Sequence, residues 1–278
     1  GSALANKSAK FRFYGVASHA GMAPDKGRSA LDAVEAMDMM VNMMREHIPS
    51  DARIHYVITN GGKAPNVVPD FAEVYYYVRH GNRKMVVDIF DRITKAAEGA
   101  ALGTGTTMKY ELIGGTHELL PNVTLQKMMY ANLVKVGGVQ YTEAEKEFGN
   151  QIMQSLGIEN GDLNKAAIVQ PYKNLDPSFG STDVGDVSFA VPTAGMGSAT
   201  WVPGTPAHSW QAVAAGGTDI GNKGMMVAAK TIALTAIDLF LHQDQIAKAK
   251  AELEEKRGKD FKYTPLLGDR KPALDYRK

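Results

Sequence analysis

Two histidines lie in settings that suit a metal-dependent hydrolase. His19 lies in the run Ser-His-Ala-Gly-Met-Ala-Pro after a strand-like stretch, and His208 lies in Gly-Thr-Pro-Ala-His-Ser-Trp between two apolar stretches. Turns at the ends of regular elements are where scaffolds present functional groups. A hydrolytic metal site needs three or more ligands, usually beside a carboxylate that moves protons. No further ligand stands at a recognisable spacing, so the sequence carries only part of such a site.

The remaining histidines indicate no second metal site. The chain has seven histidines, and none of them forms H-x-H, H-x-D or H-E-x-x-H. It has no cysteine, so disulfides and thiolate sites are excluded and any metal must be held by histidines and carboxylates. Taken singly, such histidines are more often structural or on the surface.

Two polar positions are candidates for binding a substrate carboxylate. Arg79 ends the run FAEVYYYVR and shares a strand face with Tyr75 and Tyr77. A strand-end arginine suits a bidentate clamp on a carboxylate, and a surface ion pair is the alternative. Asn66 stands between two prolines that stiffen its loop. The simpler interpretation is that this asparagine only forms a turn.

Two aspartates and a glycine-rich stretch complete the candidates. Asp183 and Asp186 are three apart, which places them either on one helix face or at a helix N-terminus. Residues 216–224 (GGTDIGNKG) have the glycine separation of a phosphate loop, but Asn222 stands where the lysine is required. We therefore interpret them as a turn into the last long helix.

Alternating strands and helices must position these groups in the first part of the chain. Period-two stretches predict strands over 10–17, 53–59, 71–79 and 106–113, with a helix opened by Ser29 and a second over 84–101. The order β-α-β-β-α-β is that of a ferredoxin-like unit, an antiparallel sheet with helices on one face. The first helix carries a second apolar strip, Met39, Met40 and Met43, which indicates either core packing or a subunit interface.

The second half has a different pattern. Helices are expected over 123–136, 143–157 and 220–241, a long loop over 158–180, buried strand ends within 183–202, and a charged helix followed by a tail over 244–278. These pieces contain too few strands for a sheet of their own.

Composition bounds the class of protein. A chain of 278 residues with 44% apolar and 22% charged residues forms one large domain or two medium ones with a sizeable core. Its net charge of +1 provides no overall excess of positive charge that would attract nucleic acid or an anionic membrane. No apolar run approaches the ~20 residues of a membrane span, and no signal peptide is visible. We expect no nucleic-acid partner, no membrane partner and a cytoplasmic location.

Five stretches in order carry a family resemblance: SHAGMAPDKGRSALDAV, APNVVP, the strand ending in Arg79, STDVGDVS and GTPAHSW. They resemble the co-catalytic zinc amidohydrolases and peptidases, which include aminoacylase, carboxypeptidase G and hippurate hydrolase. The likeness covers nearly the whole chain and weakens across 140–178 and in the tail. It implies an α/β (α+β) fold: a ferredoxin-like lid and dimerisation domain at 6–118 and, at 119–278, the C-terminal portion of a catalytic domain.

The resemblance also implies roles for residues. His208 matches the family's C-terminal zinc ligand, with Gly204 and Thr205 lining the site and Asp183 in a positioning role. His19 matches the lid histidine that reaches the partner subunit's active site and steadies the oxyanion, which implies a homodimer formed through the lid. The lid positions that hold the substrate's carboxylate side match Asn66 and Arg79.

The implied reaction is hydrolysis of the amide bond of an N-acyl amino acid or acyl-glutamate, with two zinc ions, or Mn²⁺, as cofactor. In the family, the first ligand pair, the bridging carboxylate and the catalytic glutamate all precede the lid, and they have no counterpart in this sequence. We therefore expect this chain to be inactive alone. The alternatives are a non-catalytic dimerisation or binding module, or one chain of a two-chain enzyme.

Overall fold

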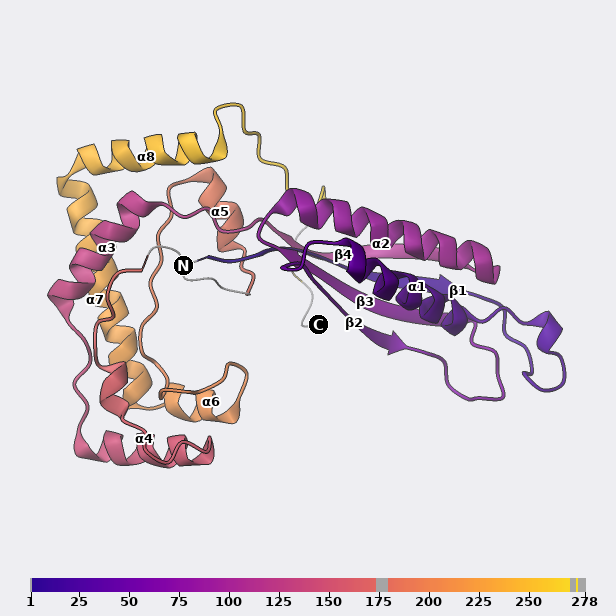
Figure 1. Cartoon of the computed structure of the whole chain (residues 1–278), viewed down its shortest axis with the longest axis horizontal. Helices are drawn as coiled ribbons and strands as arrows, with labels where there is room; N and C mark the ends of the chain where they lie inside the picture. The colour runs from indigo at the N-terminus through magenta and orange to yellow at the C-terminus, as the bar shows by residue number, and fades with distance from the viewer. Residues whose placement is uncertain (1, 174–179, 271–273, 275–278) are drawn as a thin grey trace. The chain divides into compact units, whose positions relative to one another are not determined.

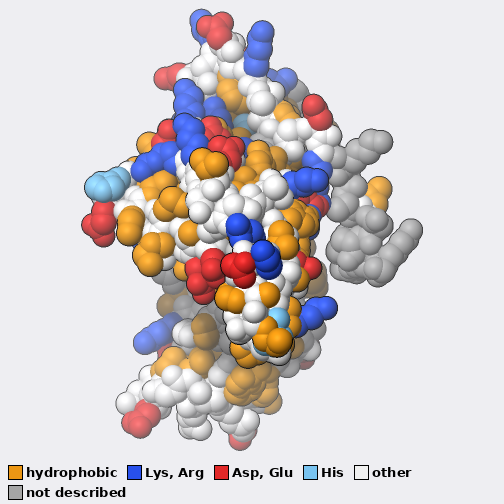
Figure 2. Space-filling view, turned by 90° about the vertical axis from the view of Figure 1, so that its right-hand side faces the viewer, with side chains coloured by type: hydrophobic (Ala, Val, Ile, Leu, Met, Phe, Trp, Pro, Cys, Tyr) orange, Lys and Arg blue, Asp and Glu red, His pale blue; other side chains and the backbone are white. Residues whose placement is uncertain are grey.

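The computed structural model describes residues 2–173, 180–270 and 274. The chain forms two compact units. We call residues 2–120, 177–190 and 262–278 the sheet unit, and residues 121–176 and 191–261 the helical unit. On the face drawn in Figure 2, basic and acidic side chains lie interspersed among hydrophobic ones.

The sheet unit is built on four antiparallel strands in the order β2-β3-β1-β4. Helices α1 and α2 lie on one face of this sheet (Figure 1). This arrangement confirms the predicted ferredoxin-like unit. The elements are β1 (Ala5–Tyr14), α1 (Ala30–Met44), β2 (Arg53–Asn60), β3 (Phe71–His80), α2 (Arg83–Thr104) and β4 (Thr107–Thr116).

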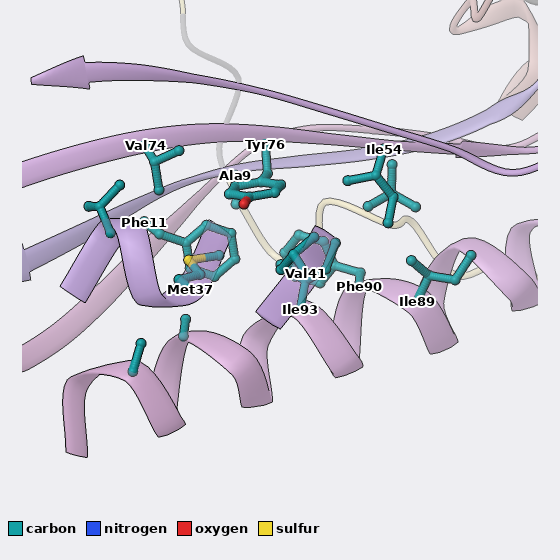
Figure 3. Close-up of a cluster of buried hydrophobic side chains, with 14 of the residues drawn as sticks. Ala9, Phe11, Met37, Val41, Ile54, Val74, Tyr76, Ile89, Phe90 and Ile93 are labelled. Atoms are coloured by element: carbon teal, nitrogen blue, oxygen red, sulfur yellow. The ribbon is translucent and has the colours of Figure 1, made fainter. Parts of the chain in front are cut away.

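The core of the sheet unit lies between the helices and one face of the sheet. Alternate residues of β1, among them Phe11 and Phe13, are fully buried, because side chains of a strand point to opposite faces with a period of two. Phe11 meets Tyr76 edge to face with ring centroids 5.9 Å apart. Figure 3 shows these rings above Ile93 and Phe90 of α2. Replacing one such buried phenylalanine with alanine costs about 3–5 kcal/mol.

Local capping fixes where the two helices begin and end. The hydroxyl of Ser29 accepts a hydrogen bond from the amide of Asp32 at 3.1 Å, as predicted for the start of α1. The side chain of Asn82 accepts one from the amide of Lys84 at 2.8 Å at the start of α2. Helix α2 ends at Gly105, whose φ of 66° is left-handed and favours glycine.

The helical unit contains α3 (Val123–Val136), α4 (Glu143–Ser155), α6 (Trp210–Gly216), α7 (Asp219–Leu241) and α8 (Gln243–Arg257). All four strands of the described residues lie in the sheet unit, so the helical unit has no described strand. Its small core joins α4, α6 and the first turn of α7 through residues that include Ile152, Met153, Ala215 and Ile220. The expected shortage of strands in this region is confirmed for the described residues.

Two predictions of local structure are wrong. The strand ends expected within 183–202 are in part a helix, α5 (Val184–Ala190). Gly185 lies so close to the carbonyl oxygen of His117 that a Cβ there would clash, a contact between distant residues that no local pattern reveals. Strand β1 begins at Ala5 instead of residue 10, because the small residues that precede Phe11 also pair with β3. Residues 174–179 of the expected loop lie outside the described residues.

Two apolar surfaces remain exposed. Met39, Met40 and Met43 of α1 are exposed, so core packing does not explain this strip. Helix α7 is long and apolar enough to cross a membrane by length and composition. The sequence alone indicates no such run, because Lys230 and Asp238 interrupt it.

Candidate functional site

His19 and Asn66 lie together at one end of the sheet unit. The loops 15–29 and 61–70, which we call the tip, are joined by three backbone hydrogen bonds. These run from Gly15 to Asp70, from Val68 to Ser18 and from Ala20 to Asn66, at 2.8, 3.0 and 2.9 Å. The structure therefore brings two of the predicted site residues side by side.

The ring of His19 is held in one orientation by its own turn. The backbone amides of Gly21 and Met22 donate to its Nδ1 at 3.2 and 3.1 Å. An imidazole nitrogen that accepts hydrogen bonds carries no proton, so the neutral ring carries its proton on Nε2. The side chain is exposed. His19 thus offers a single oriented N–H donor to a partner outside the tip.

Gly15 allows the tip to close. A Cβ at this position would overlap the carbonyl oxygen of Arg28. The neighbouring residue Val16 exchanges backbone hydrogen bonds with Arg28 at 2.8 and 2.9 Å. Any side chain at residue 15 would push the backbone of residues 15 and 16 away from that of Arg28.

Arg79 lies near the other end of β3. Its guanidinium lies over the ring of Tyr77, 5.6 Å from the centroid, and the register places it opposite Arg53 of β2. Burial lowers the pKa of the nearby His55, and the charge of Arg79 adds to this shift. Two arginines thus lie opposite each other at this end of the sheet.

Asn66 and Arg79 cannot hold one small ligand within a single copy of the sheet unit. The tip adjoins the start of β3 through the pair Tyr14 and Phe71, whereas Arg79 pairs with Asn6 at the far end. From Phe71 to Arg79 the extended strand covers about 27 Å. The two ends belong to different binding surfaces.

His208 occupies a strained turn in the helical unit. Its φ of 62° is the one left-handed angle among the described residues other than glycine. The next residue, Ser209, caps α6 by accepting from the amide of Ala212 at 3.2 Å. Strain of this kind costs on the order of 1–3 kcal/mol and gathers at functional sites. The turn also contains Gly204, with a φ of 84°, and Thr205, whose buried hydroxyl has no partner among the described residues.

Asp186 contacts residues of the sheet unit that are distant in sequence. Asp183 is exposed just before α5, which bears out the alternative of a helix N-terminus. Asp186 accepts from the hydroxyl of Tyr263 at 2.9 Å and from the amide of His117 at 3.3 Å. Burial and this hydrogen bond raise the pKa of Tyr263 to about 12.

His117 is a buried residue that sequence reasoning missed. It is 2% exposed, and its Nε2 lies 3.0 Å from the carbonyl oxygen of Thr264. Its Nδ1 has no hydrogen-bond partner among the described residues. The rings of Phe189 and Tyr263 enclose it. Its partners are distant in sequence, so no spacing could have identified it.

Comparison with known proteins identifies a part of the sheet unit. Residues 5–104 match the family described as the peptidase dimerisation domain. This part of the chain is a peptidase dimerisation domain. The dimerisation domain contains the tip and Arg79, and it agrees with the family resemblance drawn from the five sequence stretches.

The relatives cover more than this domain. The chain is 41% identical to the p-aminobenzoyl-glutamate hydrolase subunit of Escherichia coli that is designated B, over 91% of this chain and 58% of that protein. It is 30% identical to mouse Xaa-Arg dipeptidase, over 85% of this chain and 48% of that protein. The solved aminobenzoyl-glutamate utilization protein from Klebsiella pneumoniae shares the fold, with a TM-score of 0.54 at 20% identity over 85% of this chain and 49% of that chain. The chain thus spans about half the length of the relatives it matches.

The described residues do not fit a zinc pair by themselves. No group of three or more histidine, aspartate or glutamate side chains is found that could hold a metal ion in the described part of the chain. His208 is the one metal-donating residue that the family resemblance assigns here. Since a zinc site needs three or more protein ligands, no metal step can be assigned to this chain alone.

Proposed function

We propose that this chain is part of a hydrolase that cleaves the amide bond of an N-acyl amino acid, of the aminobenzoyl-glutamate class. Support comes from the 41% identity to a p-aminobenzoyl-glutamate hydrolase of E. coli and from the dimerisation domain. We place residues 6–118 in the lid and residues 119–278 in the C-terminal portion of a catalytic domain. The expected compartment is the cytoplasm.

The observation that carries this proposal is the way His19 is held. When an amide carbonyl is attacked, negative charge develops on its oxygen, and an oriented donor stabilises that charge. The two backbone amides that bind Nδ1 leave the proton of the neutral ring on Nε2, and the side chain is exposed. Such a donor needs no reorganisation when the charge appears. Asn66, beside it in the tip, offers an amide side chain to the same ligand.

The site is proposed to form across a homodimer. The tip and Arg79 lie at opposite ends of β3, so a small substrate can reach both only if they come from two copies. An isologous dimer presents the same surface twice and can bring the tip of one copy to the Arg79 end of the other. Arg79 then holds the substrate carboxylate from the second copy.

The exposed edge of the domain supports this dimer. Strand β2 is an edge strand, and its Val57 and Ile58 are exposed. The methionine strip of α1 flanks this edge, since Asn42 of α1 bonds the hydroxyl of Tyr56 in β2 at 3.3 Å. Exposed apolar edge strands pair with other chains unless they are covered.

We assign His208 as one ligand of a zinc ion whose other ligands come from polypeptide that this chain does not span, with Gly204 and Thr205 lining that site and Asp183 positioning it. Mn²⁺ is the alternative metal. The chain alone is then inactive.

Release of p-aminobenzoate from p-aminobenzoyl-glutamate tests the proposal. The purified chain is assayed with added zinc, alone and co-expressed with the region of the E. coli relative that lies outside the match, which we call the complementing region. We expect activity only with the complementing region, and its loss in His208→Ala. Zinc-dependent activity from the chain alone would refute the prediction that the metal site of this chain is incomplete. Inactivity in both arms would favour a non-catalytic dimerisation module.

A further inference from the structure

The last described stretch of the chain is bound to the sheet unit. Residues 262–270, which we call the strap, belong to this unit, although α8, the helix before them, belongs to the helical unit. The hydroxyl of Tyr263 donates to Asp186 at 2.9 Å. The carbonyl oxygen of Thr264 lies 3.0 Å from Nε2 of the buried His117. The start of the strap is therefore held by side chains of the sheet unit.

The strap then passes around the edge strand β4. Leu266 packs against Gly115 so closely that a Cβ on this glycine would lie 2.9 Å from the leucine. Gly115 pairs with Lys7 of β1, whose amine lies 4.6 Å from the centre of a phenylalanine ring of α2, so this contact is on the side of the helices. A turn closed by the amide of Gly268 and the carbonyl of Pro265, at 3.1 Å, then redirects the chain.

Arg270, which follows this turn, lies near the face of the sheet away from α1 and α2, which we call the helix-free face. Its Nη1 donates to the carbonyl oxygen of Ile113 at 2.6 Å. Burial raises the pKa of Tyr75 to about 12, and the charge of Arg270 opposes this shift. Tyr75 shares the helix-free face with Arg79, because alternate residues of a strand point the same way. The strap thus adds a second cation to the face that carries Arg79.

Hydroxyl groups lie on the helix-free face near these two arginines. The hydroxyl of Tyr75 donates to that of Tyr77 at 3.1 Å, and the guanidinium of Arg79 lies over the Tyr77 ring. Thr116 lies in register with Arg79 on the far side of β1, and its buried hydroxyl has no hydrogen-bond partner among the described residues. Hydroxyl and guanidinium groups both donate to carboxylate oxygens, so this surface suits an anion with more than one carboxylate.

The register sets the separation of the two arginines. Strand β1 lies between Arg79 of β3 and Ile113 of β4, which gives two strand spacings, or about 10 Å. Along the strands, Arg79 pairs with Asn6, and Ile113 lies between the partners of Ser8 and Ala9, about 7–10 Å further. Two long side chains that reach into this gap can hold the two ends of one small dicarboxylate.

We propose that Arg270 is a specificity-determining residue that holds the second carboxylate of an acyl-glutamate, while Arg79 of the same copy holds the first. The inference rests on the proposed function for the reaction and adds the part of the chain that selects the amino acid. One arginine clamp accepts any N-acyl amino acid through its α-carboxylate. A second guanidinium favours a ligand whose side chain carries a further negative charge.

Binding to the purified chain tests this inference without catalysis, because both arginines lie in one copy of the sheet unit. The Kd of p-aminobenzoyl-glutamate is measured by NMR from the ring signals of Tyr75 and Tyr77. It is compared with the Kd of p-aminobenzoyl-glutamine, which has nearly the same shape and lacks the second charge. We expect the chain to bind the glutamate compound more tightly by about tenfold or more.

Four variants separate selection from a loss of structure. Arg270→Ala should weaken binding of the glutamate compound to the level of the glutamine compound, and Arg270→Lys should restore part of the difference. Arg79→Ala should weaken binding of both compounds. Lys262→Ala removes an exposed charge elsewhere on the strap and should change neither Kd.

Three results would overturn the inference: no preference for the glutamate compound in the unaltered chain, an unchanged preference in Arg270→Ala, or equal weakening of both compounds by Arg270→Ala. The third would indicate a purely structural role. The chain joined by the complementing region, the complemented enzyme, is assayed in parallel. Selective binding without release of p-aminobenzoate would refute the proposed reaction and leave the role of Arg270 standing. An active enzyme whose kcat/KM ratio for the two compounds is unaffected by Arg270→Ala would do the reverse.

Discussion

A buried carboxyl in the core of the dimerisation domain makes the stability of that domain depend on pH. Asp38 of α1 is 6% exposed and accepts a hydrogen bond from the hydroxyl of Tyr76. Burial, with a smaller contribution from Glu35, raises the pKa of Asp38 from 3.8 to about 6, although the hydroxyl of Tyr76 opposes the shift. The folded state therefore binds this proton more tightly than the unfolded state does.

The sign and size follow from proton linkage. Because the folded pKa lies above the unfolded one, this group's contribution to the free energy of unfolding is greatest below pH 3.8 and is lost as the pH rises through about 6. A shift of about two units corresponds to at most about 3 kcal/mol. Asp38→Asn removes the titration and keeps an oxygen that can accept from Tyr76. We expect Asp38→Asn to raise the free energy of unfolding at pH 8 by about 1–2 kcal/mol, because it removes a buried charge. The gain falls short of the full shift because the amide hydrogens of the asparagine lack hydrogen-bond partners.

Amide hydrogen exchange in β3 reports the opening of this domain and can be followed at each pH. From pH 8 to pH 4 the difference in stability should shift by about 2–3 kcal/mol in favour of the wild type, so that Asp38→Asn becomes the less stable protein at pH 4. Asp88→Asn, at an exposed position of α2, should change stability by less than about 0.5 kcal/mol. A gap for Asp38→Asn that is the same at every pH would show that this carboxyl does not titrate differently in the fold, and would refute the reasoning.

Three further predictions concern backbone and charge. Gly15→Ala should lower Tm, with a cost in stability of about 2 kcal/mol or more, because its Cβ would overlap the backbone of Arg28. Gly81→Ala, which has open space around it, should leave Tm unchanged. Equal melting curves for the two variants would contradict this prediction. His208→Gly should keep or raise Tm, because glycine accepts the φ of 62°, and should abolish activity of the complemented enzyme; an active variant would remove His208 from the site. Although burial opposes it, hydrogen bonds from Lys256 and the start of α3 lower the pKa of Glu252 from 4.5 to about 2. This carboxylate therefore stabilises the fold fully above pH 4.5 and progressively less as the pH falls towards 2. Glu252→Gln should lower the free energy of unfolding by about 1–3 kcal/mol at pH 7, measured by denaturation followed through tryptophan fluorescence. A cost that persists at pH 2 would contradict this prediction.

Local patterns were enough to predict the dimerisation domain. The alternation around Phe11, the cap at Ser29 and the periodic apolar residues of α2 each act over a few residues, and they agree with one another. Strand β1 was placed too late because its first residues are small and polar, and only pairing with β3 shows that they extend it.

The site was harder to predict, because it depends on contacts that spacing does not encode. Asn66 and Arg79 are close in sequence, yet an extended strand carries them to opposite ends of the sheet. The tautomer of His19 depends on two amides of its own turn. His117 and α5 are held by partners far along the chain. The roles of His208, Thr205 and Asp183 stay predictions that rest on the family resemblance.

The central claim is that one substrate meets the tip of one copy and Arg79 of the other. Mixing two inactive variants of the complemented enzyme, His19→Ala and Arg79→Ala, tests it most directly. A mixed dimer has one site with both residues intact, so random reassociation should restore about a quarter of the wild-type rate of p-aminobenzoate release. A mixture that is no more active than either variant alone would contradict the account.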